Sequence, residues 1–205
     1  MNELEFAALM VSRVCHDLVS PVGAVVNGLE VLEDERDAAM RADALKLVAS
    51  SAAQAAARLQ FARIAFGAAG AAGAELDLSE VGRMVSGLLK GGKVELQWEV
   101  AGITWPKDWA KLLMNSALLA ADSLPRGGQV VVETRGDAHA PGFRIVATGQ
   151  NARLLEEVEK ALLGEPAVPL DGRSIQAYLT HRIGRNLNAG LTFRAHEGGV
   201  EIVAG

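Results

Sequence analysis

Cysteine and clustered basic residues are scarce in this chain of 205 residues, and each shortage excludes a class of protein. A single cysteine, Cys15, excludes a disulfide framework and any zinc site built on cysteines. Lys and Arg number 20 against 25 Asp and Glu, which gives a net charge of −5. No Lys/Arg cluster of the kind that neutralises a phosphate backbone is present, so we expect no nucleic-acid binding.

Long apolar runs and a positively charged N-terminus are also missing. No run approaches the roughly 18 residues that a membrane span requires. The first residues carry Glu3 and Glu5, whereas a signal peptide begins with basic residues. We therefore expect a cytoplasmic protein with no membrane association.

The chain is rich in apolar residues, and one linker divides it into two parts. Hydrophobic residues make up 50% of the sequence, enough for a real core and too much for a disordered chain. From Gly67 to Ala74 the sequence contains only glycine and alanine, which is typical of a linker. We assign residues 1–67 to a first domain, 68–76 to the linker and 77–205 to a second domain.

The first domain has the pattern of a helical hairpin. Apolar residues from Val14 to Leu32 and from Leu45 to Phe66 recur mostly at alternating spacings of 3 and 4, as in the seam of a helical bundle. The polar residues 33–37 between them predict a tight turn and antiparallel helices. Two helices cannot enclose a core alone, so we expect a homodimer in which two hairpins form a four-helix bundle.

The second domain alternates between helix and strand patterns. The expected helices are Leu78–Leu89, one around Trp109–Ala120, Leu154–Leu163 and Ser174–Leu187. The expected strands are Lys93–Val100, Gln129–Thr134, Gly142–Thr148, Leu191–Ala195 and Val200–Val203. This order predicts an α/β sandwich, a mixed sheet with its helices on one face, and an α+β fold class for the whole chain.

Of the four histidines, His16 has the most unusual surroundings. His139, His181 and His196 fall in a turn, on a helix and at a hairpin end, without metal-ligand spacing, so no metal site is expected. His16 is predicted to face away from the hairpin seam, directly before Asp17. Pro21 cannot donate a hydrogen bond to the Asp17 carbonyl, which places a helix kink beside the histidine.

An exposed histidine beside a carboxylate suits phosphoryl transfer. Neutral imidazole is a good nucleophile, and Asp17 can hold one ring N–H so that the other nitrogen is free to attack. Arg13, one turn earlier, can neutralise a phosphoryl group in transit. The alternative is an ordinary surface histidine with an incidental proline kink. The candidate catalytic residues are His16 and Asp17, and a docking stripe shares their predicted face: Arg13, Ser20, Ala24 and Asn27.

The segment from Val14 to Val22 resembles the H-box of histidine-kinase dimerisation domains: His, an acidic residue, an aliphatic residue, two variable residues, Pro and an aliphatic residue. The resemblance implies that His16 is phosphorylated, that Asp17 acts as its base and that two hairpins dimerise.

The second domain is similar to the Bergerat-type ATP-binding domain of the same kinases, with its nucleotide contacts eroded. At the Asn-rich motif, Asn115 is retained but Lys111 replaces the first asparagine. Residues 147–151 lack the Asp and the second Gly of the adenine-binding motif, and residues 174–179 lack the glycines of a phosphate loop. Each loss removes a contact to adenine, Mg²⁺ or phosphate, so ATP is not expected to bind and no cofactor of its own is expected.

A histidine hairpin joined to a degenerate kinase domain resembles the dimeric histidine phosphotransferases of alphaproteobacterial cell-cycle phosphorelays. The resemblance implies transfer between receiver-domain aspartates, from a CckA-like hybrid histidine kinase to CtrA-like and CpdR-like response regulators. The receiver would supply Mg²⁺, and the second domain would be a docking surface. Two alternatives remain: an ATP-using histidine kinase, and a non-catalytic dimeric scaffold that binds receivers.

Overall fold

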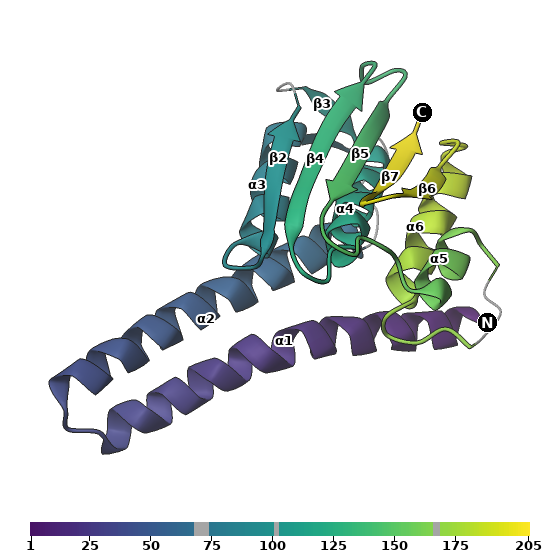
Figure 1. Cartoon of the computed structure of the whole chain (residues 1–205). Helices are drawn as coiled ribbons and strands as arrows, with labels where there is room; N and C mark the ends of the chain where they lie inside the picture. Colours follow the sequence, from purple (N-terminus) through teal and green to yellow (C-terminus); the bar gives the residue numbers. More distant parts are fainter. Residues whose placement is uncertain (68–73, 101–102, 166–168) are drawn as a thin grey trace.

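The computed structural model describes residues 1–67, 74–100, 103–165 and 169–205. Helices α1 (Glu3–Asp34) and α2 (Ala38–Ala65) form the predicted antiparallel hairpin. Figure 1 shows its closed end projecting far from the rest of the chain, hereafter the α/β half, residues 75–205. The helix ends fall where the sequence supplies caps. Asn2 and Glu5 form a reciprocal capping box, and the Asp37 carboxylate accepts from the first amides of α2.

The two hairpin helices approach closely but leave apolar surface uncovered. Gly28 of α1 is buried, and a Cβ atom there would lie 2.6 Å from a methyl carbon of Val48 on α2. Several large apolar side chains of the hairpin remain 41–70% exposed; they include Val19, Val22, Val26, Leu29, Val31, Met40, Leu45, Leu47 and Leu59. The hairpin therefore lacks a core of its own, as the spacing predicted.

Because of this apolar surface, α1 also has the length and composition of a membrane span. One window of 18 residues within Glu3–Asp34 has a mean hydropathy of at least 1.2 with no more than two charged residues, and 6% of it is buried. The expectation that no such segment exists is therefore corrected. Small and polar residues interrupt the apolar run, so a search for continuous apolar residues does not find it.

The α/β half is the predicted sandwich. Its strands are β2 (Val94–Glu99), β4 (Gly128–Arg135), β5 (Gly142–Thr148), β6 (Thr192–His196) and β7 (Gly199–Ala204). They lie in the order β2-β4-β5-β7-β6, and β2 and β4 are parallel while the other pairs are antiparallel. The sheet is therefore mixed, with helices packed behind it (Figure 1).

The helices of this half are α3 (Leu78–Leu89), α4 (Lys107–Asp122), α5 (Glu156–Leu162) and α6 (Ile175–Asn186). Helix α4 is the centre of the core, since every residue from Ala110 to Ala121 is buried. It packs against α2, α3 and α6 as well as the sheet. Because α4 is buried between the sheet and the other helices, its polar side chains contact residues of those neighbouring elements.

Two short strands were not predicted. Strands β1 (Glu75–Asp77) and β3 (Thr104–Pro106) pair antiparallel, and Trp105 of β3 is fully buried in the core. Three residues are too few to show a strand period, which is why the sequence did not reveal them. Strand β1 also begins inside the predicted linker of residues 68–76; residues 68–73 lie outside the described part of the chain.

The hairpin is attached to the α/β half at its open end. Phe61 and Ala65 of α2 belong to the same buried cluster as α3, α4 and the sheet. At the start of α1, Phe6 packs edge to face on Tyr178 of α6 at 6.3 Å. Arg182 lies over the Phe6 ring at 5.0 Å and pairs with Glu3 at 3.1 Å. The start of α1 and the end of α2 are thus both fixed to the α/β half.

Candidate functional site

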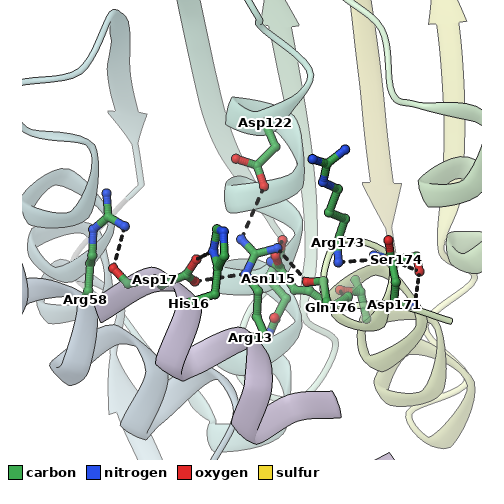
Figure 2. Close-up of polar contacts among 12 residues, drawn as sticks. Arg13, His16, Asp17, Arg58, Asn115, Asp122, Asp171, Arg173, Ser174 and Gln176 are labelled. Atoms are coloured by element: carbon green, nitrogen blue, oxygen red, sulfur yellow. Dashed lines mark hydrogen bonds and ion pairs between the residues drawn. The ribbon is translucent and has the colours of Figure 1, made fainter. Parts of the chain in front are cut away.

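His16 lies on the part of α1 that passes below the end of α4 (Figure 2). Its side chain is 87% exposed, as its position relative to the seam predicted. The ring nitrogen Nδ1 faces Asp17 and lies 3.4 Å from its Oδ1, at the long end of the hydrogen-bond range. The other nitrogen, Nε2, is thereby the one left for a reaction partner.

Asp17 connects His16 to an arginine. Its second oxygen, Oδ2, accepts a hydrogen bond from Nε of Arg13 at 2.9 Å, one turn earlier on α1. The Asp17 side chain is 26% exposed, so this pair is partly shielded from water. One carboxylate therefore bridges a fixed guanidinium and an exposed imidazole.

The position of Arg13 differs from the expectation. Arg13 was predicted on an exposed docking stripe, but its side chain is only 14% exposed. It also lies 3.8 Å from Asp122 at the end of α4 and donates to the Gly172 carbonyl at 3.4 Å. The α/β half covers this face of α1, so Arg13 is a contact between the two halves; Ala24 is half-buried, while Ser20 and Asn27 are exposed as predicted.

Pro21 lies inside α1, which continues as a helix to Asp34 and changes direction in its middle part (Figure 1). The carbonyl of Asp17, which Pro21 leaves without its helical donor, accepts instead from Nη1 of Arg58 on α2 at 2.7 Å. Arg58 was missed in the sequence. It lies in an alanine-rich helix, and its role depends on the register between the two helices, which no local pattern reports.

A cavity of about 250 Å³ lies behind this group, between the hairpin and the α/β half. Arg13, Asp17, Arg58 and Asp122 contribute its polar lining, and its apolar lining comes from α1, α2, α3 and α4. Loss of hydration at this junction raises the pKa of the Asp122 carboxyl, Asp17 adds to the effect, and the two arginines oppose it. The charges here therefore form one coupled group of two arginines and two carboxylates.

The positions that resemble a kinase Asn-rich motif contact α2. Nζ of Lys111 donates to the Gly67 carbonyl at 2.7 Å, and Nδ2 of Asn115 donates to the Ala65 carbonyl at 3.0 Å. Burial lowers the pKa of Lys111, which Asp108 opposes. Asn115 thus satisfies the last carbonyl of α2, which has no amide partner within the helix, and Lys111 binds a carbonyl two residues beyond the helix end.

The segment at the position of a kinase phosphate loop is also fixed by internal contacts. Oδ1 of Asp171 accepts from the backbone amides of Arg173 and Ser174, at 2.9 and 2.8 Å, just before α6 (Figure 2). Nε2 of Gln176 then donates to the Asn115 carbonyl at 3.4 Å. Within the described ranges no group of three or more metal-ligating side chains comes together.

Comparison with known proteins identifies the class to which this fold and site belong. Residues 78–199 match the family described as the histidine phosphotransferase C-terminal domain. The chain belongs to the histidine phosphotransferase family, and the family resemblance predicted from the sequence is confirmed.

One curated relative is protein phosphotransferase ChpT of Brucella abortus (strain 2308). It is 39% identical over 204 residues, which cover 99% of this chain and 95% of that protein. A solved structure described as a bacterial phosphotransferase aligns with a TM-score of 0.89 at 35% identity, covering 100% of this chain and 98% of the other. The predicted phosphotransferase class and the α+β architecture are therefore confirmed over the whole length of the chain.

Proposed function

We propose that this protein passes phosphoryl groups between receiver-domain aspartates through His16. The observation that carries the proposal is the geometry at the bend of α1, in a chain of the histidine phosphotransferase family. There an imidazole that is 87% exposed has one nitrogen beside a half-buried carboxylate and the other nitrogen open. Four histidines are present in the sequence, and His16 alone combines the H-box pattern with this arrangement.

The transfer step follows from this arrangement. Asp17 accepts the Nδ1–H of His16, so that the lone pair of Nε2 attacks the phosphorus of a receiver acyl phosphate. The N–P bond forms as the P–O bond to the receiver carboxylate breaks, and that carboxylate leaves with the electron pair. The Nδ1 proton stays on the ring, where Asp17 stabilises its positive charge, and transfer to a second receiver reverses these steps. Mg²⁺ belongs to the receiver in this scheme.

We further propose that the chain neither binds nor uses ATP. Two observations support this: Lys111 and Asn115 are engaged with carbonyls at and just beyond the end of α2, and the segment before α6 is held by Asp171. The residues present therefore do not fit a nucleotide with its Mg²⁺. No step of the transfer is assigned to ATP, and an ATP-using kinase is the less favoured alternative.

The expected assembly is a cytoplasmic homodimer through the uncovered apolar surface of the hairpin. Pairing two hairpins into a four-helix bundle would cover side chains such as Val22 and Leu29, each 48% exposed in the single chain. The partners suggested by the resemblance are a CckA-like hybrid kinase as donor and CtrA-like and CpdR-like response regulators as acceptors, in a cell-cycle relay. The α/β half beside His16 would contribute to receiver docking.

Radiolabel transfer tests this function directly. One reaction contains the protein, Mg²⁺ and γ-labelled ATP; a second also contains a hybrid histidine kinase with its receiver domain. We expect label on the protein in the second reaction alone, and that label should be lost in acid and kept in alkali, as for phosphohistidine. Label from ATP alone would identify a kinase. No label in either reaction, with several receivers tried, would favour the non-catalytic scaffold.

Asp17→Asn is expected to slow the transfer while leaving His16 in place. The amide cannot stabilise the charged ring as a carboxylate does, and it presents Arg13 with a neutral partner. We expect a rate roughly 10- to 100-fold lower in single-turnover transfer from a phosphorylated receiver, because a hydrogen bond between charged groups contributes about 1.5–3 kcal/mol. Asp108→Asn, on the exposed side of α4, is the matched control. An unchanged rate for Asp17→Asn would show that Asp17 has no part in the step.

A further inference from the structure

The Asp17 carbonyl needs a donor from outside its own helix. In a regular α-helix the amide of residue 21 would donate to it, but proline has no N–H. An amide or carbonyl that is shielded from water and left unpaired costs about 1–3 kcal/mol. Arg58 donates to this carbonyl from α2, 41 residues away in the sequence, at 2.7 Å.

The contact is well placed to fix the bend. Arg58 is half-buried and lines the cavity together with Phe61 and Leu18, and its Nη1 reaches across to α1. A hydrogen bond from a charged donor is about twice as strong as a neutral one. Nε of Arg58 is buried and has no partner within the described residues, so the guanidinium is held by the end that reaches Asp17.

Asp17 is thereby held at two points by two arginines. Arg58 binds its main-chain carbonyl and Arg13 binds its side-chain Oδ2, and the remaining oxygen, Oδ1, faces His16 (Figure 2). The first contact comes from α2 and the second from α1 itself. A change at Arg58 therefore moves the backbone from which both His16 and Asp17 project.

We propose that Arg58 is a positioning residue for phosphoryl transfer, because it replaces the hydrogen bond that Pro21 removes beside His16. The proposal rests on the proposed function of His16. It makes a particular prediction about coupling: Arg58 matters because residue 21 is proline. When residue 21 is alanine, its amide supplies the Asp17 carbonyl and the guanidinium becomes redundant.

The test is a double-mutant cycle with wild type, Arg58→Met, Pro21→Ala and the double variant, all as full-length protein. Transfer from a phosphorylated receiver is measured over a range of receiver concentrations, which separates the saturating rate from the half-saturating concentration. Arg58→Met is expected to lower the saturating rate by about 10- to 100-fold, the scale of a small misplacement of reacting groups. The half-saturating concentration should be nearly unchanged, because Arg58 faces the cavity.

In the Pro21→Ala background, adding Arg58→Met should change the saturating rate by less than about twofold, since the helical hydrogen bond is then present. Arg58→Lys keeps a positively charged donor on a shorter side chain and should recover part of the rate. It takes the place of Arg58→Met in the cycle if Arg58→Met does not fold. Arg63→Met is the matched control, because Arg63 is an exposed arginine of the same helix.

An equal fall in the saturating rate in the wild-type and Pro21→Ala backgrounds would overturn the inference. A change in the half-saturating concentration alone would also overturn it, because it would mean that Arg58 contacts the receiver. Full activity of folded Arg58→Met would also overturn it. These results differ from failure of the proposed function, in which the wild-type protein itself would acquire no label.

Discussion

Replacement of His16 by alanine is expected to abolish phosphoryl labelling of the protein and all transfer between receivers. The imidazole is the only group of this protein that bonds to phosphorus in the proposed step, so no residual rate through the protein should remain. Stability should hardly change, by about 0.5 kcal/mol or less, because surface substitutions away from caps and packed sites have small effects. The His16 side chain is 87% exposed, which places it in that class.

The measurement is label on the protein in the donor reaction, with thermal unfolding of the same sample as a check of folding. His139→Ala is the matched control, since the His139 side chain is 97% exposed on a turn of the α/β half. It should retain full labelling. Persistent label on His16→Ala that keeps the alkali stability of phosphohistidine would assign the phosphoryl group to one of the other three histidines.

Leu29→Glu is expected to convert the dimer into a monomer. Leu29 is 48% exposed on the hairpin, at a position that the proposed four-helix bundle would bury. Because only 48% of Leu29 is left to cover, the substitution removes about 1 kcal/mol of apolar burial from each subunit, and it also places a carboxylate in an apolar interface. Because each 1.4 kcal/mol changes a dissociation constant tenfold, the dimer constant should rise by at least about 100-fold.

Sedimentation or light scattering at micromolar concentration measures this change. Leu163→Glu provides the matched control, because Leu163 is 50% exposed at the end of α5, away from the hairpin. The control should remain dimeric. A wild-type protein that is monomeric at this concentration would overturn the dimer proposal, and an equal loss in both variants would mean that the interface is not confined to the hairpin.

The elements with a strong period were predictable from the sequence, and those that depend on tertiary contacts were not. Helix α3 and strand β5 begin and end at the predicted residues, because an apolar pattern of the right period runs along each. The hairpin and its polar turn followed from heptad-like spacing. Strands β1 and β3 have three residues each and no period, so only the fold reveals them.

The site shows the same division. The H-box pattern and the predicted face of α1 identified His16, Asp17 and Pro21. The exposed His16 side chain agrees with the predicted face. Arg13 could not be placed, because a helical wheel does not show which face another domain covers. Arg58 could not be found at all, since its partner is a carbonyl on a different helix.

Lys111 illustrates a further limit of sequence comparison. Its place in the Asn-rich motif indicated the loss of a nucleotide contact, but not the contact that replaced it. The cap that Lys111 and Asn115 place on the end of α2 appears only once the two halves are assembled. The loss of a motif in the sequence therefore predicts which ligand contact is missing. The contact that the changed residues make instead is seen only in the structure.

That cap has a thermodynamic consequence for the relay. Lys111 and Asn115 are engaged at the end of α2, and on the proposal that the chain does not bind ATP, nucleotide hydrolysis supplies no free energy to His16. On the proposed function it acts as a carrier that speeds both directions equally, and the relative acyl-phosphate levels of the receivers decide which way phosphate flows. A relay built on such a carrier can reverse, draining its response regulators whenever the upstream receiver is itself dephosphorylated.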